Sequence, residues 1–162
     1  MGLLTFFGIL PSHAIDIGAP APAPTAMDQD GKPVSFADIY QKGITLVYFY
    51  PKANTGGCTA EACSLRDSYA DLTAKNLQIL GVSEDKEDAQ KSFQTKFKLP
   101  FTLIADHDGV VARAFGVPTM GGFAKRQSFL VQDGKIVWRD LHASTSHQAA
   151  DVTAALEELA KK

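Results

Sequence analysis

Hydrophobic and polar positions follow two alternating patterns along this chain. Short, unbroken apolar runs rich in β-branched and aromatic residues predict buried strands at 44–50, 77–82, 102–105 and 128–131. Apolar residues that recur every three or four positions predict helices after Cys58, near residues 85–97 and from Thr145 onward. Strands alternating with helices are typical of an α/β protein, with a central mixed, mostly parallel β-sheet flanked by helices.

Turn and boundary signals separate these elements. The dipeptide at 133–134, Asp-Gly between two strand patterns, predicts a type I′ hairpin. Thr145 with Gln148 predicts a capping box for the last helix. Alternating Ala and Pro over residues 15–24 predict an extended lead-in, and residues 117–122 are expected to be irregular and mobile.

Composition narrows the function classes. A length of 162 residues fits one domain, and 45% hydrophobic with 21% charged residues is ordinary for a globular protein. The net charge of −2, without a Lys/Arg cluster, suggests neither nucleic acid nor a membrane surface as partner. Two cysteines are too few for a disulfide scaffold, and neither their spacing nor the scattered histidines match a metal site.

Residues 1–14 are the one segment with a targeting pattern. An apolar run at 3–10 is followed by Pro-Ser-His-Ala, which resembles a signal-peptidase site, although the basic n-region is missing. The run is too short to span a membrane. We therefore expect a truncated signal-like segment at 1–14 and a single domain at 15–162. The protein would be periplasmic or exported if the segment is such a remnant, and cytoplasmic if it is only an apolar extension.

The chemistry centres on Cys58. The apolar run 44–50 ends at Pro51, and after a short turn containing Gly57 the helical pattern opens on this cysteine. A helix start beyond the carboxyl end of a central strand is where open α/β sheets place their reactions. Free N–H groups there favour a thiolate, Gly57 permits close backbone approach, and the Thr55 hydroxyl can turn toward the sulfur or a bound oxygen. The alternative is a buried, inert cysteine.

Cys63 lies five residues after Cys58. On a continuous helix the two are rotated by about 140° and separated by ~7.5 Å along the axis. A disulfide needs Cα atoms roughly 4.4–6.8 Å apart with converging side chains. Either the two cysteines are unrelated, or the start of the helix must unravel to join them.

The motif P-x-x-x-T-x-x-C, formed by Pro51, Thr55 and Cys58, resembles the signature of peroxiredoxins. The segment YFYPKANTGGCTAEACSLRD is similar to the bacterioferritin-comigratory, or peroxiredoxin Q, subfamily, and the likeness extends from Ile15 to the C-terminal helix. It implies a thioredoxin-like fold and reduction of hydrogen peroxide and organic hydroperoxides by a peroxidatic Cys58. It also implies an intrachain disulfide with a resolving Cys63, recycling by thioredoxin or a similar dithiol protein, and no cofactor.

Two charged residues complete the candidate site. By resemblance, Arg126 matches the arginine beside the peroxidatic sulfur, where a guanidinium stabilises developing negative charge. Without the resemblance it is a solvated cation. Glu61 is either a first-turn acid that complements the helix dipole or a hydrogen-bond partner that steadies Arg126.

Gly56 departs from the subfamily, which commonly has proline there, and predicts a looser turn.

Two other function classes remain open at this level. A thioredoxin-like disulfide reductase uses a C-x-x-C pair, whereas four residues separate the cysteines of this chain. A non-catalytic redox sensor could use the same pair of thiols. The subfamily contains monomers and weak homodimers, so the oligomeric state stays open as well.

Overall fold

The computed structural model describes residues 14–162, so the predicted signal-like segment lies, apart from Ala14, outside the described residues. A five-stranded sheet in the order β5-β4-β3-β8-β9 forms the centre. Its strands are β3 (Thr45–Phe49), β4 (Gln78–Ser83), β5 (Thr102–Ala105), β8 (Gln127–Gln132) and β9 (Lys135–Asp140). The middle strand β3 runs parallel to β4 and antiparallel to β8.

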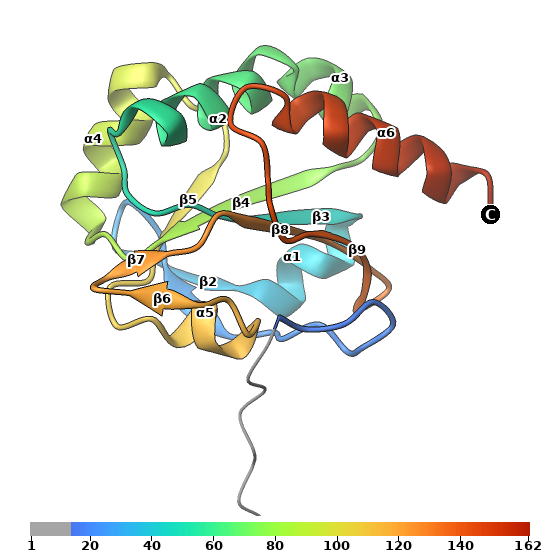
Figure 1. Ribbon diagram of the computed structural model, residues 1–162, viewed down its shortest axis with the longest axis horizontal. Coiled ribbons are helices and arrows are strands. Elements are labelled where there is room, and N and C mark those ends of the chain that lie inside the picture. The colour runs from blue at the N-terminus through green and yellow to red at the C-terminus, as the bar shows by residue number, and fades with distance from the viewer. Residues whose placement is uncertain (1–13) are drawn as a thin grey trace, which may run out of the picture.

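Helices and small hairpins cover the two faces of this sheet (Figure 1). One face carries the helices α2 (Gly56–Asp67), α3 (Tyr69–Ala74), α4 (Glu87–Phe97) and α6 (Gln148–Ala160). The other carries α1 (Phe36–Lys42), α5 (Val110–Ala114) and the pairs β1 (Thr25–Met27) with β2 (Pro33–Ser35) and β6 (Thr119–Met120) with β7 (Phe123–Ala124). Among the helices of the described residues, none combines the length and hydropathy that a bilayer crossing requires.

The apolar run that forms β3 is buried at all five positions. Successive side chains of a strand point to opposite faces. Leu46 and Tyr48 accordingly pack with the helices α2, α3, α4 and α6, whereas Val47 and Phe49 pack with α1 and α5. Two hydrophobic clusters, one on each face of the sheet, therefore both contain side chains of β3.

The predicted mixed α/β sheet flanked by helices is confirmed, and one detail is corrected. The pairings are evenly divided, with two parallel pairs (β3-β4 and β4-β5) and two antiparallel pairs (β3-β8 and β8-β9), so the sheet is not mostly parallel. The reason is that the β8-β9 hairpin enters beside β3. The turn of that hairpin has φ of 52° at Asp133 and 73° at Gly134, as the predicted type I′ turn requires.

Residues 117–122 are not irregular throughout, because Thr119 and Met120 form the strand β6 of a short hairpin. Gly121 and Gly122, with φ of 59° and 85°, make its turn. Both values lie in the left-handed region that glycine enters without steric cost. The expectation of an irregular stretch overlooked that two adjacent glycines can close a hairpin.

The predicted capping box of the last helix is also wrong. Helix α6 does begin at Gln148, but its N-cap residue is His147 and makes no side-chain cap bond. The backbone N–H of His147 instead donates to Oγ of Ser144 at 3.1 Å. Because α6 begins only at Gln148, Thr145 lies two residues before the N-cap, and the Gln148 side chain accepts from Oγ of Ser128 at 2.6 Å.

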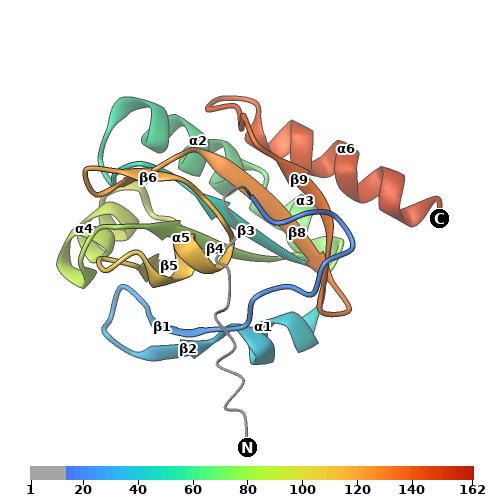
Figure 2. The ribbon, with the colours of Figure 1, turned by 60° about the horizontal axis from the view of Figure 1, so that its bottom comes forward.

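The predicted extended lead-in is confirmed only in part: Gly18 has φ of 90° and the N–H of Ala19 donates to the carbonyl of Asp16 at 3.2 Å, which makes a turn. Residues 18–21 then follow the outer side of β9 (Figure 2). The N–H of Gly18 donates to the carbonyl of Ile136 at 2.7 Å, and the N–H of Ile136 donates to the carbonyl of Ala19 at 3.0 Å. Nη1 of Arg139 donates to the carbonyls of Ala14 and Ile15 at 3.2 and 3.1 Å. These bonds fix the lead-in to the sheet.

Candidate active site

The site begins where β3 ends and α2 begins. The chain leaves β3 through Pro51 and a turn in which Asn54 has φ of 63°. Thr55 is the N-cap of α2, and the helix starts at Gly56. Cys58 is therefore the third residue of α2, at its N-terminal end, and only 1% of its surface is exposed. The predicted helix N-terminus at Cys58 is confirmed, although the helix begins two residues earlier, at Gly56.

Arg126 lies directly beside this sulfur. Its Nη2 donates to Sγ of Cys58 at 3.4 Å. The contact follows from strand register, because Phe49 pairs with Gln127 and so places Arg126, one residue earlier, next to the carboxyl end of β3. Cys58 and Arg126 are distant in sequence, and the antiparallel pairing of β3 with β8 brings them together.

Glu61 accepts a hydrogen bond from the other terminal nitrogen of the same guanidinium. Nη1 of Arg126 donates to Oε1 of Glu61 at 2.7 Å, and the Glu61 side chain is 0% exposed. Burial raises the pKa of Glu61 to about 8, although the charge and hydrogen bond of Arg126 oppose this rise. Since α2 starts at Gly56, Glu61 lies beyond the first turn, so the dipole interpretation does not apply. The geometry corresponds to the alternative, a hydrogen-bond partner of Arg126.

Gly57 is enclosed by neighbouring side chains. A Cβ atom at this position would lie 3.1 Å from Nη2 of Arg126 and 3.2 Å from Cγ2 of Thr145. Thr145 belongs to the segment between β9 and α6, which is fixed here by a bond from the N–H of Ala143 to the carbonyl of Arg126 at 3.3 Å. Sequence reasoning missed Thr145, because only the capping pattern drew attention to it.

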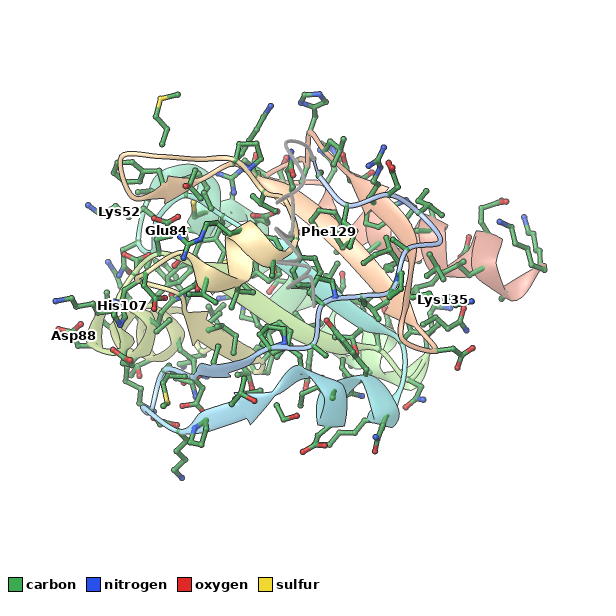
Figure 3. All side chains as sticks on the ribbon, turned by 90° about the horizontal axis from the view of Figure 1, so that it is seen from below. Lys52, Glu84, Asp88, His107, Phe129 and Lys135 are labelled. Atoms are coloured by element: carbon green, nitrogen blue, oxygen red, sulfur yellow. The ribbon has the colours of Figure 1, made fainter. Side chains whose placement is uncertain are left out.

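Thr55 and Pro51 frame the turn before the helix. The hydroxyl of Thr55 donates to the carbonyl of Lys52 at 2.8 Å and so closes the turn on itself. Its predicted role toward a bound oxygen stays a prediction. Nζ of Lys52 lies 5.9 Å from the ring centroid of Phe123 in β7, which links this turn to the β6-β7 hairpin. Figure 3 places Lys52 at the same end of the molecule as Glu84 and His107.

Cys63 lies further along α2, partly exposed, and both cysteines are free thiols. The helix is continuous from Gly56 to Asp67, so it includes both residues. The separation predicted for an intact helix therefore applies. In this conformation the two sulfurs cannot form a disulfide.

Two tyrosines from β3 and its extension lie among the apolar residues beneath the site. Tyr48 and Tyr50 stack with ring centroids 5.4 Å apart, and Oη of Tyr50 donates to Oε1 of Gln90 at 2.6 Å. Burial raises the pKa of Tyr48 well above its ordinary value, and the nearby Tyr50, Glu61 and Cys58 raise it further. Burial raises the pKa of Tyr50 as well, so both phenols stay neutral. Sequence reasoning treated this strand only as core, because an unbroken apolar run does not show which of its side chains lie near a reactive sulfur.

The arrangement supplies a nucleophilic sulfur, a fixed cation beside it and a buried carboxyl group that orients the cation. Within residues 14–162, no group of three or more His, Cys, Asp or Glu side chains is placed to hold a metal ion. Such a site can attack an electrophilic atom and stabilise the negative charge that develops on the leaving group.

Comparison with known proteins gives one family. The model of the AhpC/TSA family matches residues 17–139. "Peroxiredoxin Q, chloroplastic" of Suaeda salsa is 38% identical over 122 residues, covering 74% of this chain and 56% of the relative. The protein of the same name from Arabidopsis thaliana is 38% identical over 125 residues, covering 76% and 57%. The chain thus spans little more than half the length of these relatives.

Solved structures resemble this chain over most of its length. Peroxidoxin BcpB from Mycobacterium tuberculosis has a TM-score of 0.84 at 28% identity, covering 90% of this chain and 98% of that one. The bacterioferritin comigratory protein of Xanthomonas campestris, described for its alkyl peroxide reduction activity, has a TM-score of 0.80 at 26% identity, covering 90% and 99%. The predicted thioredoxin-like fold is confirmed by these neighbours.

Proposed function

This chain belongs to the AhpC/TSA family, and on that premise we propose that it is a thiol peroxidase acting on hydrogen peroxide and organic hydroperoxides. The observation that carries the proposal is the 3.4 Å contact between Nη2 of Arg126 and Sγ of Cys58 at the start of α2. The relatives named peroxiredoxin Q support it.

In the first step, the Cys58 thiolate attacks one oxygen of the hydroperoxide. An S–O bond forms, the O–O bond breaks, and the leaving oxygen takes a proton and departs as water or an alcohol. The contacts of Arg126 with Cys58 and Glu61 support a role in which it stabilises both the thiolate and the charge on the leaving oxygen. Cys58 ends this step as a sulfenic acid.

In the second step, the thiol of Cys63 condenses with the Cys58 sulfenic acid, which gives an intrachain disulfide and releases water. The two residues lie on one continuous helix, so the start of α2 must unwind before the sulfurs can meet. A dithiol protein such as thioredoxin then reduces the disulfide by thiol–disulfide exchange. The reduced helix reforms and the cycle repeats.

The test is intact-mass analysis after one equivalent of hydrogen peroxide. The unmodified chain should lose two hydrogens, mapped to the peptide that contains Cys58 and Cys63. Cys63→Ser should still consume the first equivalent but accumulate oxygen on Cys58, and Cys58→Ser should remain unchanged. Equal loss of the initial peroxide consumption in both variants contradicts these roles.

Turnover with a thioredoxin system separates an enzyme from a redox sensor. An enzyme should consume many equivalents of peroxide per chain as long as reductant is supplied. A sensor should react once and then wait for a protein partner. A single equivalent consumed in the presence of active thioredoxin and its reductase contradicts the peroxidase proposal.

A further inference from the structure

Helix α2 begins with two glycines in different surroundings. At Gly57 a Cβ atom would approach Arg126 and Thr145 to 3.1 and 3.2 Å, so neighbouring side chains already occupy that space. At Gly56 a Cβ atom would meet nothing within 4 Å. Neither glycine has a positive φ. Packing therefore accounts for glycine at 57, whereas neither packing nor backbone conformation requires it at 56.

The same helix start receives little support from capping. The side chain of the N-cap Thr55 makes no cap bond, since its hydroxyl donates back to Lys52, and the first turn of α2 carries no acidic residue. Helix α1, by contrast, has Ser35 accepting from the N–H of Asp38 and an acid in its first turn. Capping bonds and first-turn acids both stabilise a helix start. The first turn of α2 lacks both.

Glycine at the first helical position weakens this turn further. It loses more backbone freedom on becoming helical than any other residue, so a segment that contains it favours the unwound state. Gly56 is exposed, and no contact with a side chain of its own offsets that loss. The first residue of α2 thus contributes no side-chain contact that would hold the turn in its helical form.

We propose that Gly56 is the point from which α2 unwinds, and that its missing side chain sets how fast Cys63 reaches oxidised Cys58. This inference rests on the proposed peroxidase function. The Cys58 sulfenic acid has two fates: it condenses with the Cys63 thiol and releases water, or a second hydroperoxide adds another oxygen and leaves as water or alcohol. Fast unwinding favours the disulfide, so Gly56 protects Cys58 from irreversible oxidation.

A graded series at position 56 tests the proposal. Gly56→Ala adds a methyl group into open space and stabilises the helical turn. Gly56→Pro restricts the chain further, and the turn can accept it, because proline is favoured at the first helical position and Thr55 has φ of −88° and ψ of 158°, as residues before proline prefer. The rate of disulfide formation should fall in the order Gly, Ala, Pro.

The readout is rapid mixing with one equivalent of hydrogen peroxide, acid quench and intact mass. Disulfide formation should slow by about two- to five-fold in Gly56→Ala, as the helix propensities of glycine and alanine imply, and more in Gly56→Pro. The rate of the first oxidation of Cys58 should change by less than about two-fold, since a Cβ atom at position 56 would meet nothing within 4 Å. With excess peroxide, the fraction of doubly oxygenated Cys58 should rise in the same order.

Ser92→Ala is the matched control, because Ser92 is an exposed residue inside α4, where alanine also favours the helix. It should leave the rate of disulfide formation unchanged. Thermal unfolding of the reduced variants verifies that each is folded. Equal or faster disulfide formation in Gly56→Ala and Gly56→Pro overturns the inference and leaves the peroxidase proposal standing. Failure of peroxide to oxidise Cys58 in the unmodified chain overturns the proposed function itself.

Discussion

The two faces of the sheet differ in what they bury. The face covered by α1 and α5 is built around phenylalanine rings, with Phe49, Phe115 and Phe129 in mutual contact at centroid distances of 5.4–6.0 Å. The face covered by α2, α4 and α6 buries Glu61, which binds Arg126, as well as Gln90, Ser128 and Gln148. The other face buries Asp106, whose two oxygens accept from backbone N–H groups of α5. Buried polar groups are costly unless they are bonded, so they are expected where chemistry needs them. One face mainly stabilises the fold, and the other also holds the reactive sulfur.

Removing a ring from the phenylalanine face should have the largest effect on stability. Phe129→Ala deletes a fully buried side chain of β8, near the centre of the view in Figure 3, and should lower the free energy of unfolding by about 3–5 kcal/mol. Urea denaturation measures this loss. Among the molecules that remain folded, the rate constant for peroxide should stay unchanged. A fall in that rate constant as large as in a variant of the reactive site would contradict the division of roles between the two faces.

Arg126→Met should have the opposite profile. Loss of the charge beside Cys58 should lower the rate constant for peroxide by about 10²–10³-fold, the usual effect of removing a donor that stabilises developing negative charge. Stopped-flow kinetics of the first oxidation measures it. Arg139→Met is the matched control, since that arginine binds Asp16 and the lead-in on β9, and should affect only stability. Equal rates in the two variants contradict the role of Arg126.

Tyr50→Phe replaces a phenol of the reactive face with the phenylalanine ring that is typical of the other face. It removes the bond from Oη to Oε1 of Gln90 and leaves that buried oxygen without its donor, which should cost about 1–3 kcal/mol of unfolding free energy. Urea denaturation of Tyr50→Phe beside Tyr40→Phe gives the comparison, because the Tyr40 hydroxyl is only partly buried and donates to the carbonyl of Pro22. No loss in Tyr50→Phe would show that the polar groups of this face do not depend on their bonds.

Glu61→Gln should have the smallest effect under mildly acidic conditions, because glutamine keeps an acceptor oxygen for Arg126. The folded chain holds the Glu61 proton up to a pKa of about 8, whereas the unfolded chain releases it near the ordinary value of 4.5. The folded state thus binds more protons, so this group lowers stability as pH rises from about 4.5 to about 8. Glu61→Gln should remove that decline, measured by urea denaturation across this range.

Glu157→Gln on the exposed side of α6 is the control for this pH series, and its stability should follow the unmodified chain. A Glu61→Gln variant whose stability declines with pH as steeply as the unmodified chain would contradict the assignment. In that case a group other than Glu61 holds the proton in the folded state.

Much of this fold could be predicted because local patterns determine it. The apolar run of β3, the Asp-Gly turn at 133–134 and the helix beginning next to Cys58 all depend on neighbouring residues. The contact of Arg126 with the sulfur depends instead on the register of β3 and β8, which no local pattern specifies. Only the family resemblance predicted that contact.

Two smaller features show where local patterns fail. Thr145 and Gln148 have the spacing of a capping box, yet α6 begins only at Gln148, whose side chain accepts from Ser128 instead. Glu61 has the position of a surface acid on a helix, but its side chain is fully buried and accepts a hydrogen bond from Arg126, the residue just before β8. In both cases the outcome depends on a competing or covering group that the pattern does not contain.

The lead-in along β9 has a consequence for solubility. An outermost strand with unpaired amides and carbonyls invites the same strand of another molecule to join it, which is a route to fibrils and precipitates. The backbone of residues 18–21 already occupies part of that side of β9, while Asp28 and Gln29 cover part of β5 at the opposite limit of the sheet. A chain that lacks the residues up to 21 should therefore aggregate more readily. The reactivity of its Cys58 with peroxide should be unchanged.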